Sequence, residues 1–79
     1  MFVYEHYPII TPSELLAVLL NAGFKIIRQN GSHIRIENQA TEKSTTIPMH
    51  AKDLSRALTQ KILRQAGISI KEFLKLLGK

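Results

Sequence analysis

Apolar and polar residues alternate along the chain with two different periods, and the change of period predicts the order of its elements. From Thr11 to Phe24 the apolar positions follow the period of an amphipathic helix. Thr11 is a natural N-cap, and Glu14 three residues later suits a capping box. Gly23 is the expected left-handed stop. The residues expected to face the core are Leu15, Leu16, Leu19 and Leu20.

Three β-type segments follow this helix. Residues 24–29 are rich in strand formers, and residues 32–38 alternate strictly between apolar and polar side chains. Asn30-Gly31 lies between them and predicts a two-residue type I′ hairpin turn. A polar turn then leads into the β-branched segment "STTIPM", which Pro48 ends.

A two-residue turn at Asn30-Gly31 determines which hairpin residues share a face, since paired residues lie on the same side. It pairs Arg28 with His33 and sends Phe24 and Ile26 to the solvent side, a conflict that a bulge in the first strand would remove. The residues predicted to lie together on the open face are Arg28, His33 and Arg35. The residues predicted to face the helices are Ile27, Ile34 and Ile36.

The last third of the chain predicts two more helices. Residues 51–67 form the first, and Gly67 stops it. Ser69 caps the second, with Glu72 as its capping-box partner. The expected core-facing residues are Leu54, Ala57, Leu58, Ile62 and Ala66 in one helix, and Phe73, Leu74, Leu76 and Leu77 in the other.

The order α-β-β-β-α-α predicts an α+β fold. Its economical arrangement is a three-stranded antiparallel sheet with the helices on one face, as in double-stranded-RNA-binding domains. Seventy-nine residues allow a single domain over 1–79, in which residues 1–10 are a lead-in segment suited to a short strand or an extended arm. The chain has no cysteine, no apolar run near 20 residues and no signal-peptide pattern, so we expect a cytoplasmic protein.

Charge narrows the choice of partner. Eleven Lys and Arg against six Asp and Glu give a net charge of +5. Such a balance on a small chain is typical of proteins that bind nucleic acid, or an acidic protein that mimics it. The alternative is a basic domain without any polyanionic partner.

A histidine between two arginines suits phosphodiester cleavage. Histidine accepts or donates a proton near neutral pH, and guanidinium groups hold a phosphate and stabilise the charge that develops on it. RNA is the natural substrate because its 2′-OH can serve as the nucleophile. The carboxylates are scattered, so we expect no metal and no other cofactor. The alternative is that His33 is exposed and idle.

Other basic residues leave the interpretation open. His50 follows the third strand and suits either a capping role or a phosphate contact. Lys52 and Arg56, expected at the start of the second helix, suit phosphate contacts near its positive dipole end or an ordinary solvated face. Three further cations of the last third are interpreted as solvent-facing: Lys61, Arg64 and Lys71.

Several motifs together resemble the HicA family of small toxins. They are "GFKIIRQNGSHIRIEN", "TTIPMH", "DL" and "ILRQAGIS" followed by "EF", and the resemblance covers about residues 11–77. It implies a double-stranded-RNA-binding-like fold and a ribonuclease that cleaves messenger RNA, neutralised by a HicB-type antitoxin. The catalytic histidine of the family is the one in G-S-H, here His33. "ALTQ" at residues 57–60 departs from the G-T-L-R-like stretch that members commonly carry.

The sequence therefore predicts a toxin with His33 as catalytic residue, on a face that the antitoxin covers together with the apolar Phe24 and Ile26. The predicted phosphate-binding residues are Arg28, Ser32, Arg35, Lys52 and Arg56. Two alternatives stand beside it: a non-catalytic RNA-binding module that uses the same face, and a degenerate toxin kept as an antitoxin-binding scaffold.

Overall fold

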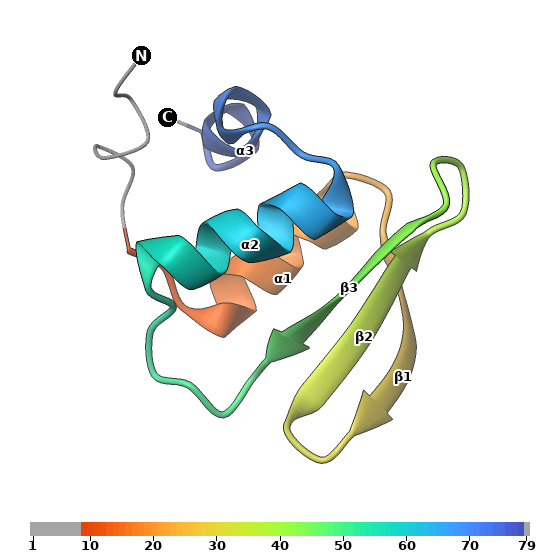
Figure 1. Cartoon of the computed structure of the whole chain (residues 1–79), viewed down its shortest axis with the longest axis vertical. Helices are drawn as coiled ribbons and strands as arrows, with labels where there is room; N and C mark the ends of the chain where they lie inside the picture. Colours follow the sequence, from red (N-terminus) through yellow and green to blue (C-terminus); the bar gives the residue numbers. More distant parts are fainter. Residues whose placement is uncertain (1–8, 79) are drawn as a thin grey trace.

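Helices and strands follow one another in the predicted order α-β-β-β-α-α (Figure 1). This computed structural model describes residues 9–78, so the expectation for most of the lead-in segment lies outside the described residues. The elements are α1 (Pro12–Asn21), β1 (Lys25–Asn30), β2 (His33–Asn38), β3 (Lys43–Pro48), α2 (Arg56–Ala66) and α3 (Ile70–Leu76).

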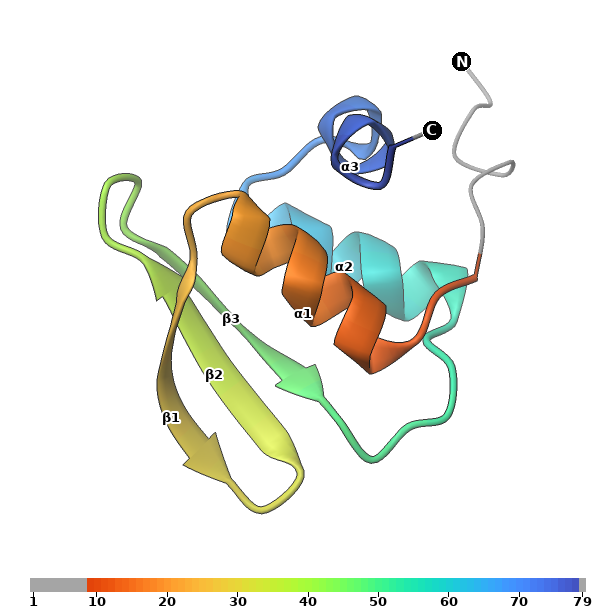
Figure 2. The ribbon, with the colours of Figure 1, turned by 180° about the vertical axis from the view of Figure 1, so that it is seen from behind.

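The three strands form one antiparallel sheet in the order β1-β2-β3, which confirms the α+β class. Figures 1 and 2, which show opposite sides, place α1 and α2 together against one side of the sheet. Both helices pack against β3, while β1 lies farthest from them. α3 packs on α1 and α2 as a further layer. None of the described helices therefore covers the open face, defined as the side of the sheet turned away from the helices.

The predicted capping box of α1 is confirmed. The Thr11 hydroxyl accepts from the Glu14 N–H at 3.2 Å, and the Glu14 carboxylate accepts from the Thr11 N–H at 2.8 Å. The core-facing stripe differs from the prediction at one end: Val18 is buried whereas Leu20 is exposed. Burial therefore follows the i, i+3, i+4 spacing from Leu15.

Replacing Thr11 with alanine is expected to lower the free energy of unfolding by about 1 kcal/mol, because the first turn of α1 loses the acceptor for an otherwise unpaired N–H. Urea denaturation at 25 °C measures the change. Ser13→Ala is the matched control, since Ser13 is exposed inside the same helix and alanine favours helix there. Equal stability of the two variants would contradict a role of the cap.

The pairing of β1 with β2 is shifted by two residues from the prediction, because the hairpin turn lies one residue further along the chain. Asn30 pairs with His33 and Arg28 with Arg35, so the two loop residues are Gly31 and Ser32. Gly31 has a φ of 63°, and Ser32 is not among the described residues with positive φ. This is the glycine-first pattern of a type II′ turn, which fits the strand twist as well as the predicted Asn-Gly type I′ turn.

β1 contains a bulge between Ile26 and Arg28, which removes the conflict noted in the sequence. Phe24, predicted to lie on the open face, is buried in the core. Ile26, also predicted to lie on the open face, pairs with the buried Ile36 and so lies on the helix-facing side, although it is 48% exposed. Ile27, predicted to face the helices, is 50% exposed. The reason is that β1 is an edge strand beyond the reach of the helices, so all six of its residues are exposed.

β2 follows the predicted alternation, with Ile34 and Ile36 in the core. α2 is shorter than predicted because Ser55 is its N-cap, so Leu54 lies before the helix, where its N–H donates to the Ile10 carbonyl. The predicted core face of α2 was partly wrong, since Ala57 is exposed and Leu58 only half-buried. The residues of α2 that are buried are Thr59, Ile62, Leu63 and Ala66.

α3 begins at the predicted cap, where the Ser69 hydroxyl accepts from the Glu72 N–H at 3.1 Å. Phe73 is completely buried, whereas Leu74, Leu76 and Leu77 pack against the core half-buried. None of the helices between residues 9 and 78 has the length and apolarity to cross a membrane.

Candidate functional site

Strand pairing arranges the open face as rows of side chains across the three strands. His33 pairs with Asn30 on β1 and with Pro48 on β3. The next row is Arg28, Arg35 and Thr46. Because paired residues share a face, the structure brings together the predicted site residues Arg28, His33 and Arg35, although not through the predicted pairs. All three are exposed.

These rows enclose a small hollow of about 180 Å³, called here the arginine hollow. Its lining residues are Arg28, Asn30, His33, Arg35 and Thr46. A hydrogen bond holds the Arg35 side chain in place: its guanidinium donates from Nη2 to the Ser44 hydroxyl at 3.0 Å. The hollow thus carries two guanidinium groups and one imidazole, a combination suited to a single phosphate group.

A second, larger depression of about 550 Å³, called here the helix groove, lies beside the first. It runs around the free edge of β3, because residues from both faces of that strand line it together with α2. His33 and Arg35 border both depressions. The lining residues of the helix groove are His33, Arg35, Ser44, Thr45, Thr46, Pro48, Leu58, Lys61, Ile62 and Gln65.

A partly buried hydrogen bond holds α2 beside β3 and so shapes the helix groove. The hydroxyl of Thr45 donates to the Gln65 side-chain oxygen at 2.8 Å. Thr45 is buried, and an unpaired hydroxyl there would be costly. With α2 in this position, Lys61 lines the helix groove together with His33. The sequence had suggested only a solvent-facing role for Lys61. Its i−4 spacing from Gln65 is the sequence signal that could have indicated this position.

The segment after β3, which contacts the hairpin turn, brings a second imidazole to the site. The rings of His33 and His50 lie with their centroids 5.4 Å apart, inclined by 51°. The Ser32 Oγ lies 3.4 Å from His50 Nδ1, so Ser32 contacts the second histidine. Both histidines are exposed. The sequence left two roles open for His50, capping and phosphate contact, and did not predict that it lies beside His33.

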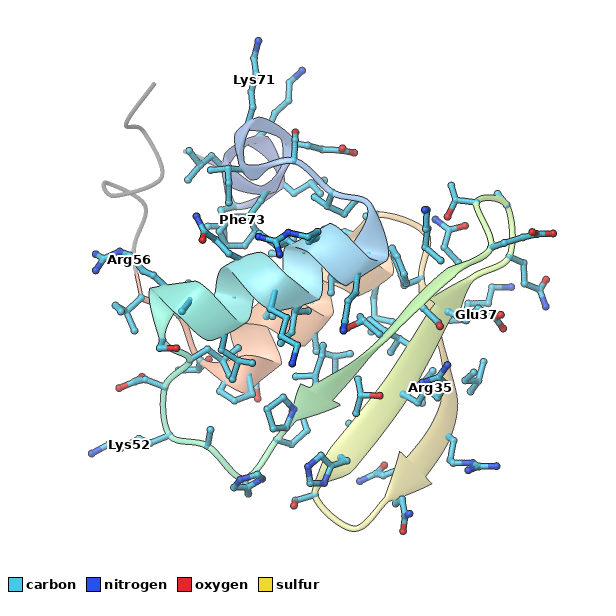
Figure 3. The ribbon with its side chains drawn as sticks, viewed as in Figure 1. Arg35, Glu37, Lys52, Arg56, Lys71 and Phe73 are labelled. Atoms are coloured by element: carbon cyan, nitrogen blue, oxygen red, sulfur yellow. The ribbon has the colours of Figure 1, made fainter. Side chains whose placement is uncertain are left out.

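Lys52 and Arg56 do not join this group. Lys52 lies in the connection before α2 and Arg56 is the first residue of that helix. Figure 3 shows both side chains pointing outward at the end of the molecule away from Arg35. Neither residue lines the arginine hollow or the helix groove. A role for them in phosphate binding therefore stays a prediction that this geometry does not favour.

Within residues 9–78, no three histidine or acidic side chains gather in a way that could hold a metal ion. What the site offers is proton transfer by imidazole and binding of negative charge by guanidinium and ammonium groups.

Comparison with known families agrees with the motifs. The family described as the HicA toxin of bacterial toxin-antitoxin systems matches residues 12–68, which is most of the chain. None of the curated proteins matches this chain. The fold defines a small α+β domain with a basic, histidine-bearing sheet face. The chain belongs to the HicA toxin family, and membership of a toxin–antitoxin family implies an antitoxin as its partner.

Proposed function

We propose that this toxin is a metal-independent endoribonuclease that cleaves messenger RNA with His33 as a catalytic residue. The observation that carries the proposal is the position of His33 at the boundary of the arginine hollow and the helix groove, beside the guanidinium of Arg35. A strand of RNA can place one phosphate against Arg28 and Arg35 while its neighbours extend past Lys61. The net charge of +5 favours such a polyanion.

The chemistry follows from the groups at this boundary. The 2′-oxygen of RNA attacks the adjacent phosphorus, and its proton passes to an imidazole. The bond from phosphorus to the 5′-oxygen breaks, and that oxygen takes up a proton. Arg28 and Arg35 stabilise the extra negative charge that develops on the phosphoryl oxygens. The products are a 2′,3′-cyclic phosphate and a free 5′-hydroxyl.

The antitoxin proposed for this site is of the HicB type and covers the open face. Ile26 and Ile27, each about half exposed, lie on β1 next to Arg28. Ile27, at the bulge directly before Arg28, provides apolar contact area on the edge strand β1, whereas Ile26 pairs with the buried Ile36 and lies on the helix-facing side. Neither Phe24, which is buried, nor Ile26, which lies on the helix-facing side, offers the open-face apolar surface that the sequence predicted for them, so Ile27 is the apolar residue proposed for contact with the antitoxin.

The substrate test compares three strands of the same base sequence. We expect the purified toxin to cut the RNA in the presence of EDTA, and to leave the fully 2′-O-methylated strand and the DNA strand intact, because both lack the 2′-OH nucleophile. Gel electrophoresis and mass spectrometry of the product ends measure this. Binding of all three strands without cleavage would support the RNA-binding module instead. Cleavage of the methylated strand, or cleavage of RNA that EDTA abolishes, would contradict the proposed chemistry.

A further inference from the structure

We propose that His50 is a second catalytic histidine, which transfers a proton at the same phosphodiester as His33. The inference rests on the proposed ribonuclease function and goes beyond it by naming the partner for proton exchange. Cleavage by the 2′-OH needs one group that accepts a proton and another that donates one, and no described carboxylate lines either depression. His50 also lines neither depression, but its ring lies beside that of His33, which borders both.

Distance is the first argument. The imidazole centroids of His33 and His50 are 5.4 Å apart, and both rings are exposed to an incoming strand. A hydrogen bond from a ring nitrogen to an oxygen spans about 2.8 Å. Two rings at this separation can therefore both reach oxygens of a single phosphodiester. The tilt of 51° means that the rings are not stacked on each other.

The second argument is that two contacts hold His50 in this position. The N–H of Met49, the residue before it, donates to the Ser32 carbonyl at 2.6 Å. The Ser32 Oγ lies 3.4 Å from His50 Nδ1. Both contacts connect the segment after β3 to Ser32, the turn residue directly before His33. Because Ser32 occupies Nδ1, Nε2 is the nitrogen that His50 presents to RNA.

The proton balance assigns one step to each ring. One neutral imidazole takes the 2′-OH proton as the bond from the 2′-oxygen to phosphorus forms. The other, protonated, imidazole gives its proton to the 5′-oxygen as the bond from phosphorus to that oxygen breaks. After release of the cyclic phosphate, the two rings have exchanged protonation states, and exchange with water restores them.

The experiment measures kcat, KM and the pH dependence of kcat for wild type, His33→Ala, His50→Ala and His50→Gln. The substrate is an RNA oligonucleotide with one linkage that the wild type cuts. Histidine to glutamine keeps a hydrogen-bonding side chain but cannot titrate. We expect both His50 variants to lose at least about 100-fold in kcat with little change in KM, and to lose one limb of a bell-shaped pH profile.

A second substrate assigns the roles. It carries sulfur in place of the 5′-oxygen at the cleaved linkage, and a thiolate leaves without needing a proton. We expect this substitution to restore a rate close to that of the wild type in only one of the two alanine variants, which identifies the proton donor. Restoration in both, or in neither, would overturn the pairing of the two histidines.

Further outcomes separate this inference from the proposed function. If the wild type cuts RNA and His50→Gln cuts it equally well with an unchanged pH profile, His50 only positions the turn and the inference fails alone. If the wild type cuts no RNA, both fail. Lys71→Ala is the control for handling and folding, because Lys71 is exposed and points away from the body of the protein on α3 (Figure 3).

Discussion

Toxin in which alanine replaces His33 is expected to cleave RNA about 10²–10⁴ times more slowly than the wild type, because it loses a positioned proton-transfer group. Its affinity for RNA is expected to change little. Arg28 and Arg35 remain in the arginine hollow, and charge rather than one imidazole dominates the binding of a polyanion. Single-turnover cleavage and fluorescence anisotropy with the same RNA oligonucleotide measure the two quantities.

Expression of the wild type and of His33→Ala in cells tests whether toxicity depends on His33. On induction, we expect the wild type to arrest growth with decay of messenger RNA, and His33→Ala to do neither. Lys71→Ala is the matched control, since it also removes an exposed polar side chain by truncation to alanine, but on α3. Equal arrest by wild type and His33→Ala would indicate toxicity through RNA binding. No arrest by either folded protein would favour the scaffold alternative.

Replacing Phe73 with alanine is expected to lower the free energy of unfolding by about 3–5 kcal/mol. Phe73 is fully buried and is one of the largest side chains of the core. A chain of 79 residues has a total stability of roughly 4–12 kcal/mol. The variant is therefore expected to be partly unfolded at 37 °C. Urea denaturation and thermal unfolding followed by circular dichroism measure the loss.

The stability of Phe73→Ala tests whether α3 belongs to the cooperative folding unit. The family match ends at residue 68, before α3, yet α3 places Phe73 against α1 and α2. Lys71→Ala, on the exposed side of the same helix, is expected to change stability by less than about 0.5 kcal/mol. A loss below about 1 kcal/mol in Phe73→Ala would show that α3 is not part of the cooperative core.

Exposure of the site explains why a toxin of this kind needs a separate partner for control. α1 and α2 cover one side of the sheet, and no described helix lies over His33 or Arg35 on the other. Under the proposed function, the same open face would receive either a strand of RNA or the surface of the antitoxin. We expect a protein that occupies the arginine hollow to block the two guanidinium groups and His33 together, since all three line it.

Local chemistry determined much of this fold from the sequence alone. The caps at Thr11 and Ser69 and the strict alternation of β2 act over a few residues, so their outcome hardly depends on the rest of the chain. They placed two helix starts and the core-facing isoleucines correctly. The G-S-H motif likewise drew attention to His33, because a histidine beside arginines has recognisable chemistry wherever it folds.

Tertiary structure decided the rest, because those features depend on packing between distant segments. Either Asn30-Gly31 or Gly31-Ser32 can form a hairpin turn, and the choice follows from where Phe24 and Ile36 are buried. The start of α2 depends on the pairing of Leu54 with Ile10. His50 comes to lie 5.4 Å from His33 because β3 returns antiparallel to β2, a proximity between residues 17 positions apart that no local pattern encodes.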